Sequence, residues 1–94
     1  MSYYASANGK RIEIKNAKTI DEAKMLVDGD IGRFDADVYI DDGDANKPIC
    51  KRAWHSESYD DLNAEERMPY RFVDNRPIVF GDGKFYGPWE EVQQ

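Results

Sequence analysis

The stretch NGKRIEIKNAKTIDEAKMLVDG, residues 8–29, contains a turn signal, an alternating strand pattern and a capped helix in direct succession. Within it, Lys10–Lys15 alternates polar and apolar side chains, which is typical of a half-buried strand whose two isoleucines face the core. The pair Asn8-Gly9 favours a two-residue hairpin turn. Residues Tyr3–Ala7 are therefore predicted to form the partner strand.

The second part of this stretch predicts a helix over Ile20–Asp28. The Thr19 hydroxyl can accept a hydrogen bond from the backbone N–H of Glu22, and the Glu22 side chain can reach back to Thr19, which together make a capping box. Gly29 supplies the left-handed residue that ends many helices. Apolar residues recur at the spacing of one helical face, at Ile20, Ala23, Leu26 and Val27.

Two more hairpins and one helical turn are predicted in the rest of the chain. Asp37–Asp41 and Pro48–His55 have strand character and are joined by a polar loop. Asn63 can cap a single helical turn that Pro69 ends. The pattern of Ile78–Tyr86 is that of a second hairpin.

In this last hairpin, a two-residue turn at Asp82-Gly83 would place Phe80 opposite Phe85 and Val79 opposite Tyr86. The element order predicts an α+β fold, with a small, mostly antiparallel sheet of four to five strands and one main helix packed on one face. Ninety-four residues are expected to form a single domain, 1–94.

The composition indicates a folded cytoplasmic protein. Apolar residues make up 40% of the chain and aromatic residues 13%, which is more than disordered acidic chains contain. The single cysteine, Cys50, cannot form an internal disulfide and therefore favours a reducing compartment. No apolar run approaches the roughly eighteen residues of a membrane-spanning helix.

Negative charge is concentrated in residues 28–44, which hold seven aspartates and one basic residue, Arg33. The net charge of this block equals that of the whole chain, −6. Such a charge repels the phosphates of nucleic acid and the headgroups of an anionic membrane, and it suits a basic protein surface. Charged surface also commonly serves solubility alone, so this second interpretation stays open.

The predicted partner-binding residues are aspartates around the Asp37–Asp41 strand and two aromatic anchors. Strand alternation places Asp37, Tyr39 and Asp41 together on one face. Pro88 cannot donate to a sheet ladder, so Trp89 is predicted to lie at or beyond the sheet edge, as an exposed anchor. The full set is Asp35, Asp37, Tyr39, Asp41, Asp42, Asp44 and Trp89.

Signatures of metal binding and catalysis are incomplete. Asp42, Asp44 and Asn46 occupy the first, third and fifth positions of a calcium loop, but the sixth position is Lys47 instead of glycine and the twelfth is Ala53 instead of glutamate. The chain has one histidine and one cysteine, too few for a zinc site without several carboxylates. We therefore expect no catalytic residues, no cofactor and no metal, and a protein that is not an enzyme.

In its overall plan the chain resembles the small acidic proteins of bacteriophages and other mobile elements, including anti-CRISPR and other anti-defence proteins. The shared features are the short acidic chain, the capped helix that begins at Thr19–Lys24, and an ending built from Val79–Gly81, Phe85–Gly87 and Trp89. The likeness is one of class and carries no diagnostic motif, so it assigns no role to any single residue.

The resemblance implies a protein that binds a host protein or ribonucleoprotein complex through a basic surface, in the cytoplasm of the bacterial host. It would act as an inhibitor that blocks the nucleic-acid-binding surface of a defence complex, as a DNA mimic or by locking a conformation, with no direct contact to nucleic acid or membrane. The alternative is a non-catalytic accessory adaptor, or a homodimeric module whose sheet edge pairs with itself.

Overall fold

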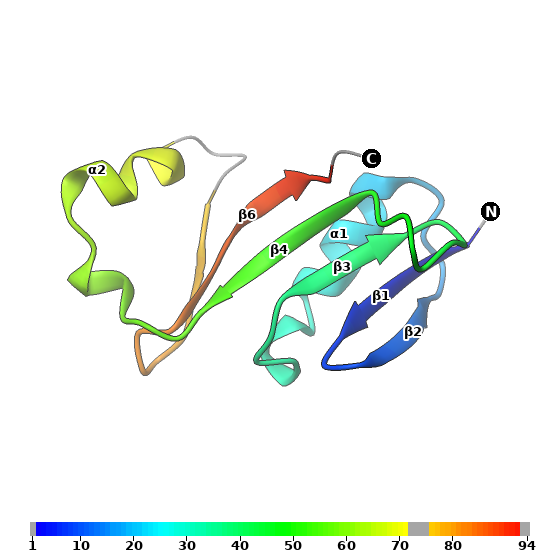
Figure 1. Cartoon of the computed structure of the whole chain (residues 1–94), viewed down its shortest axis with the longest axis horizontal. Helices are drawn as coiled ribbons and strands as arrows, with labels where there is room; N and C mark the ends of the chain where they lie inside the picture. The colour runs from blue at the N-terminus through cyan, green and yellow to red at the C-terminus, as the bar shows by residue number, and fades with distance from the viewer. Residues whose placement is uncertain (1, 72–75, 93–94) are drawn as a thin grey trace.

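The computed structural model describes residues 2–71 and 76–92 and shows an antiparallel six-stranded sheet with strand order β2-β1-β3-β4-β6-β5 (Figure 1). In chain order the elements are β1 (Tyr3–Ala7), β2 (Lys10–Ile14), α1 (Ile20–Asp28), the 3-10 helix η1 (Ile31–Arg33), β3 (Val38–Asp41), β4 (Cys50–His55), η2 (Tyr59–Asp61), α2 (Ala64–Arg67), η3 (Met68–Arg71), β5 (Ile78–Val79) and β6 (Phe85–Glu91). The α+β class and the antiparallel sheet are confirmed. The expected four to five strands and single main helix are wrong in detail, because β5 counts as a sixth strand and α2 as a second short helix.

The N-terminal hairpin forms as predicted. Asn8 and Gly9 both have positive φ, 53° and 76°, which is the backbone of the tight turn that matches strand twist. The register runs from Ala7 opposite Lys10 to Tyr3 opposite Ile14. Ile14 is buried in the core, whereas Ile12 is 38% exposed, so only one of the two isoleucines that were expected in the core lies there.

Helix α1 has the predicted bounds, but its ends differ from expectation. The Thr19 hydroxyl accepts from the Glu22 N–H at 3.1 Å and lies 3.4 Å from the Glu22 carboxylate, so the reciprocal bond joins two side chains instead of reaching the Thr19 backbone. The prediction of a left-handed stop at Gly29 is wrong, since Gly29 has a φ of −65°. The chain continues in a right-handed sense into η1, so no reversal is needed there.

The sheet is covered on its two faces at opposite ends of a molecule that measures 40 × 23 × 23 Å (Figure 1). Helix α1 packs on β1 and β2, over a core that includes Ala5, Ala23 and Val38. Phe85 and Tyr86 are neighbours in β6 and therefore point to opposite faces. Tyr86 belongs to the core on the α1 side, whereas Phe85 is covered by rings from the segment that carries η2, α2 and η3.

The C-terminal hairpin is shifted by one residue from the predicted register. Ile78 pairs with Tyr86 and Val79 with Phe85, so Phe80 does not face Phe85. The loop has three residues, because Gly83 has a φ of +90° and donates its N–H to the Phe80 carbonyl at 2.9 Å. A left-handed residue at the end of a three-residue loop is the usual way in which such a hairpin keeps the twist of its strands.

The helical turn predicted at Asn63 is present as α2. Asn63 accepts from the Glu66 N–H at 2.8 Å, and the Glu66 carboxylate accepts from the Asn63 N–H at 3.1 Å, which completes a capping box. The α-helix ends before Pro69, and the chain passes through Pro69 as the 3-10 helix η3. Among residues 2–71 and 76–92, no helix is long and apolar enough to cross a membrane.

Candidate functional site

Asp28, the first aspartate of the acidic block, is a structural residue. One oxygen of its carboxylate accepts from Arg52 Nη1 at 3.0 Å and from the indole Nε1 of Trp89 at 3.0 Å. Burial raises the pKa of Asp28, although the Arg52 guanidinium opposes this. Asp28 thus joins the end of α1 to β4 and β6 from inside the fold.

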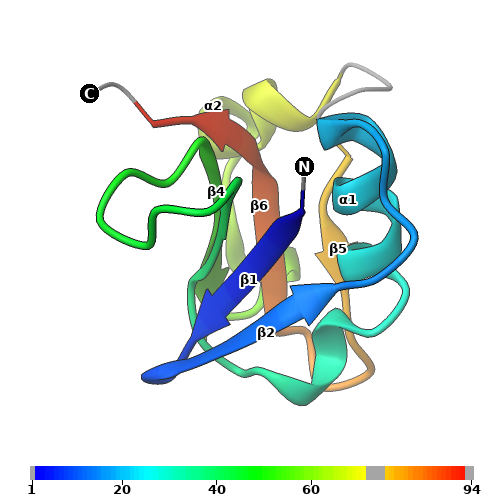
Figure 2. The same cartoon turned by 90° about the vertical axis from the view of Figure 1, so that its right-hand side faces the viewer.

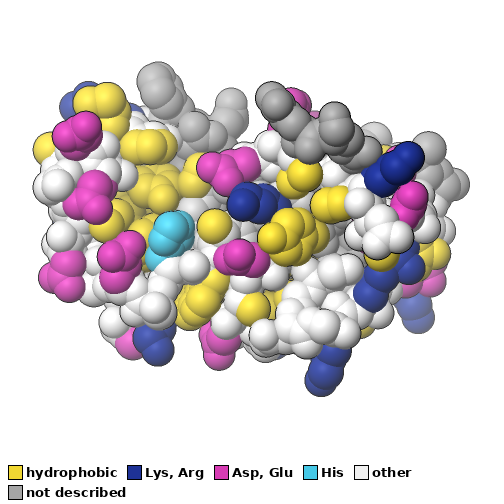
Figure 3. All heavy atoms as spheres, viewed as in Figure 1, with side chains coloured by type: hydrophobic (Ala, Val, Ile, Leu, Met, Phe, Trp, Pro, Cys, Tyr) yellow, Lys and Arg dark blue, Asp and Glu magenta, His cyan; other side chains and the backbone are white. Residues whose placement is uncertain are grey.

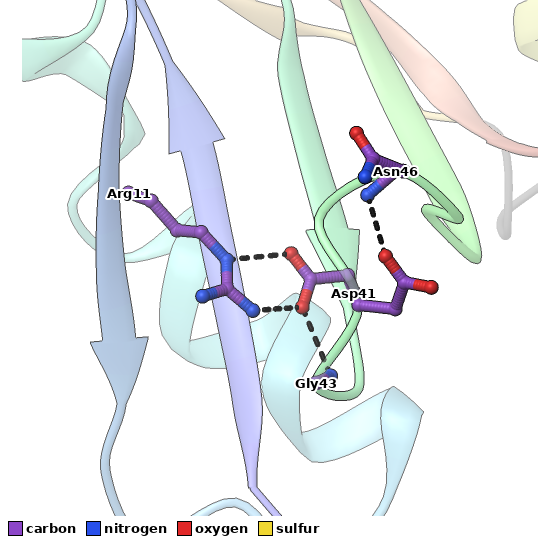
Figure 4. Close-up of polar contacts among 5 residues, drawn as sticks. Arg11, Asp41, Gly43 and Asn46 are labelled. Atoms are coloured by element: carbon purple, nitrogen blue, oxygen red, sulfur yellow. Dashed lines mark hydrogen bonds and ion pairs between the residues drawn. The ribbon is translucent and has the colours of Figure 1, made fainter.

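Asp41 is also used internally, which corrects the prediction that it projects from an exposed acidic face. The residue is 2% exposed, and Arg11 grips its carboxylate with Nη2 at 2.6 Å and Nε at 3.1 Å (Figure 4). The Gly43 N–H donates to the same carboxylate at 3.0 Å, and the Arg11 guanidinium lies 4.0 Å from the centre of the Tyr4 ring. The hydrogen bonds from Arg11 hold the pKa of Asp41 below its ordinary value.

Two further aspartates have local partners. Asp37 lies just before β3 and accepts the backbone N–H of Trp54 at 2.8 Å. Asp30 forms an ion pair with Arg33 at 3.0 Å on the surface. The aspartates that form a continuous block in the sequence therefore have separate partners in the structure, most of them far away along the chain.

Besides Asp37, three more aspartates of the predicted set are exposed, and they are not gathered in one place. Asp35 precedes β3 and Asp42 follows it, so these two residues lie at opposite ends of the strand. Asp44 lies in the β3–β4 loop and accepts from the Asn46 N–H at 2.9 Å (Figure 4). Tyr39 is half-buried on β3. A partner-binding role for these residues stays a prediction.

Trp89 is not the exposed edge anchor that the sequence predicted. It lies within β6, opposite Arg52 of β4, and it packs against the core on the α1 side. Its indole N–H is bonded to Asp28. Pro88 is tolerated beside it because β5 is short: β5 pairs only with Phe85 and Tyr86, and this leaves the rest of β6 free on that side.

The densest exposed acidic surface lies instead on the segment that carries η2 and α2, and we call it the acidic end. Residues 57–66 contain five carboxylates and no lysine or arginine. All five are exposed: Glu57, Asp60, Asp61, Glu65 and Glu66. Figure 3 shows acidic side chains gathered at the end of the molecule that carries α2, and basic side chains more frequent toward the opposite end.

Arg67 follows this segment but does not pair with its carboxylates. Its Nη2 donates to the backbone carbonyls of Tyr59 at 3.2 Å and Asp60 at 2.9 Å, and its guanidinium lies 5.1 Å from the centre of the Tyr59 ring. Arg67 therefore stabilises the backbone of the acidic end through these two carbonyls. The signal that could have identified this surface is the absence of basic residues from 57–66, whereas residues 28–44 include Arg33.

An aromatic cluster fixes the acidic end to the sheet. The buried Phe85 ring has His55 stacked on it at 4.6 Å, with Tyr59 at 5.3 Å and Tyr70 at 6.0 Å in edge contact. Burial raises the pKa of Tyr70. A Cβ on Gly87 would lie 3.3 Å from the Tyr70 hydroxyl and 3.4 Å from His55 Nε2, so glycine allows both rings to sit close to β6.

His55 belongs to this packing, with Glu57 beside it at 3.7 Å. Within residues 2–71 and 76–92, no three or more histidine, cysteine or acidic side chains are placed to hold a metal ion together. Cys50 lies on the opposite face of β4 from His55, is 1% exposed, and burial raises its pKa to about 11. The acidic end thus combines exposed carboxylates with aromatic rings that pack on Phe85.

Comparisons with known proteins give no relative. No protein-family model matches the chain, and neither a curated protein nor a solved structure matches it at a significant level.

Proposed function

We propose that this protein is a small, non-catalytic inhibitor that binds a basic surface of a nucleic-acid-handling host complex through its acidic end. The observation that carries the proposal is the set of five exposed carboxylates within residues 57–66, held on a short helical segment. Carboxylates arranged in this way suit the arginines and lysines that otherwise receive nucleic acid phosphates.

The rigidity of the segment favours binding. The Tyr59 N–H donates to the Gly83 carbonyl at 2.8 Å, the Asn63 capping box fixes the start of α2, and Arg67 bonds two carbonyls of η2. Groups that are already ordered lose little conformational entropy when they bind. The acidic end therefore presents its charge at a lower cost than a flexible acidic loop would.

The net charge of −6 supports a protein partner over a nucleic acid partner. Phosphates would be repelled by the acidic end, whereas a basic cleft would attract it over about one Debye length, which is about 8 Å at physiological salt. Binding to such a cleft is expected to weaken as salt rises.

The test is affinity capture from a bacterial lysate at low and moderate salt, with the captured proteins identified by mass spectrometry. The informative variant neutralises four carboxylates without touching the capping box: Glu57→Gln, Asp60→Asn, Asp61→Asn and Glu65→Gln. A matched variant neutralises the exposed aspartates of the sequence-predicted set other than Asp37, which accepts the Trp54 N–H, with Asp35→Asn, Asp42→Asn and Asp44→Asn. Thermal unfolding confirms that both variants fold.

We expect capture of a nucleic-acid-binding protein or complex that is released by salt and displaced by nucleic acid. The four-carboxylate variant should bind it about ten- to a hundredfold more weakly, since each exposed ion pair contributes about 0.2–1 kcal/mol. Equal binding by this variant and the wild type would refute a role for the acidic end. If only the matched variant loses binding, the partner-binding site lies at residues 35–44 and not at the acidic end.

A further inference from the structure

The edge of the sheet at β2 is open, at the end of the molecule opposite the acidic end (Figures 1 and 2). Ala7 and Lys10 close the two-residue turn and therefore form a hydrogen-bonded pair. Alternation along the antiparallel ladder then directs the backbone N–H and C=O groups of Arg11 and Glu13 away from β1. These groups can receive another strand.

β2 has neither a proline nor a bulge to block its edge, and its exposed charged side chains are of both signs: Lys10, Arg11 and Glu13. It is a five-residue strand without proline, and all five of its residues pair with β1 in regular register. The opposite edge differs, because β5 has only two residues and follows Pro77. A long regular edge is the one suited to strand addition.

Apolar side chains accompany this edge on the α1 side of the sheet. Ile12 is 38% exposed and Leu26 of α1 is 48% exposed. Two adjoining hollows of about 160 and 220 Å³ lie there, and Ile12, Arg33 and Phe34 line both of them. Apolar surface next to unpaired backbone indicates an interface.

The sequence of β2 is self-complementary in charge about Ile12. Antiparallel pairing of two β2 strands must match outward-facing residues with outward-facing residues, so either Arg11 faces Arg11, Glu13 faces Glu13, or Arg11 faces Glu13. The first two registers oppose like charges. The third places Arg11 of each copy, whose Nε and Nη2 also hold Asp41 of its own copy, opposite Glu13 of the other copy. It also brings the two Ile12 side chains together on the axis.

We infer that a second copy of this chain pairs with β2 in this third register, so that two molecules form a two-fold dimer with one continuous sheet. Both Arg11–Glu13 pairs lie on the face away from α1, and the Ile12 and Leu26 side chains meet on the α1 face. An isologous contact of this kind is closed, so it yields a dimer and does not extend into a filament. The acidic ends lie far from this axis and stay available, so the inference does not depend on the proposed function.

The experiment is sedimentation equilibrium over a concentration series, with wild type, Glu13→Lys and Glu65→Lys. The wild type is expected to rise from the 10.9 kDa monomer toward twice that mass. Glu13→Lys opposes two pairs of like charges and should weaken the dimer at least about tenfold. Glu65→Lys makes the same charge change on α2 and should leave it unchanged. Circular dichroism confirms folding.

Amide hydrogen exchange gives a second readout that reports on the backbone. The amides of Arg11 and Glu13 should become protected as the wild-type concentration rises, whereas those of Ile12 and Ile14 are bonded to β1 at every concentration. A monomer up to about 1 mM, where even weak association would be visible, overturns the inference. So does a dimer that Glu13→Lys leaves intact, or protection of Arg11 and Glu13 that appears only when a different protein is added.

Discussion

The cluster of Asp28, Arg52 and Trp89 allows a prediction about which half of a buried ion pair matters more. The Arg52 side chain is 5% exposed, whereas that of Asp28 is 32% exposed. Arg52 also donates to the Arg76 carbonyl at 2.8 Å, and its Nε is buried with no hydrogen-bond partner among residues 2–71 and 76–92. The perturbations to compare are Asp28→Ala and Arg52→Met.

Asp28→Ala is expected to be severe. It leaves the Arg52 guanidinium buried without its counterion, which costs about 3–5 kcal/mol when one partner of a buried pair is removed. The Trp89 N–H also loses its acceptor. A domain of this size has about 5–14 kcal/mol of total stability, so the loss is a large part of it. The melting temperature should fall by at least about 12 °C.

Arg52→Met is expected to be mild. Asp28 can be rehydrated where it is exposed, and it keeps its bond to Trp89. The substitution also removes the unsatisfied Nε. Burial raises the pKa of Asp28 and lowers that of Arg52, so desolvation outweighs their attraction. Replacing such a charge by an apolar side chain of similar length should change the free energy of unfolding by about 1 kcal/mol or less.

The assay is urea unfolding followed by far-ultraviolet circular dichroism, because the fluorescence of Trp89 would respond to the substitutions themselves. The double variant Asp28→Ala/Arg52→Met should be more stable than Asp28→Ala alone, since it no longer contains an unpaired buried charge. The reasoning is refuted if Arg52→Met is as destabilising as Asp28→Ala, or if the double variant equals the sum of the two single changes.

Two further predictions concern Asp41 and Gly83. The hydrogen bonds from Arg11 lower the folded-state pKa of Asp41, so its contribution to stability is present above the unfolded pKa of about 3.9 and is lost as pH falls through the lower folded value. Asp41→Asn should therefore reduce the fall in melting temperature that the wild type shows at acid pH. An unchanged fall in this variant would contradict the Arg11 contact. Gly83→Ala should cost about 1–3 kcal/mol in urea unfolding, because φ is +90° and the new Cβ would lie 2.4 Å from Ser58 Oγ. Adding Ser58→Ala should restore only part of the loss, since the backbone strain remains; full recovery would show that the clash alone matters.

A helix or hairpin was predictable wherever its turn or cap residues and its apolar pattern lie within one short segment. The hairpin of β1 and β2 follows from Asn8-Gly9, and α1 follows from Thr19 and a single apolar face. The register predicted for the C-terminal hairpin was wrong because Asp82-Gly83 suits both a two-residue turn and the end of a three-residue turn. This one-residue difference moves Phe80 into contact with Trp54 and Tyr86, on the opposite face from Phe85.

The sequence by itself determined the α+β class, the first hairpin, α1, the cap of α2 and the net charge, because propensity, turn chemistry and charge are local or additive properties. Only the tertiary structure decided what each carboxylate does. Asp28 is bonded to Arg52, 24 residues away, because α1 shares a core with β4. Asp41 is bonded to Arg11, 30 residues away, because β1 alone separates β2 from β3 in the sheet. Strand pairing separates charges that are neighbours along residues 28–44, whereas the five carboxylates of residues 57–66 stay exposed on one short segment.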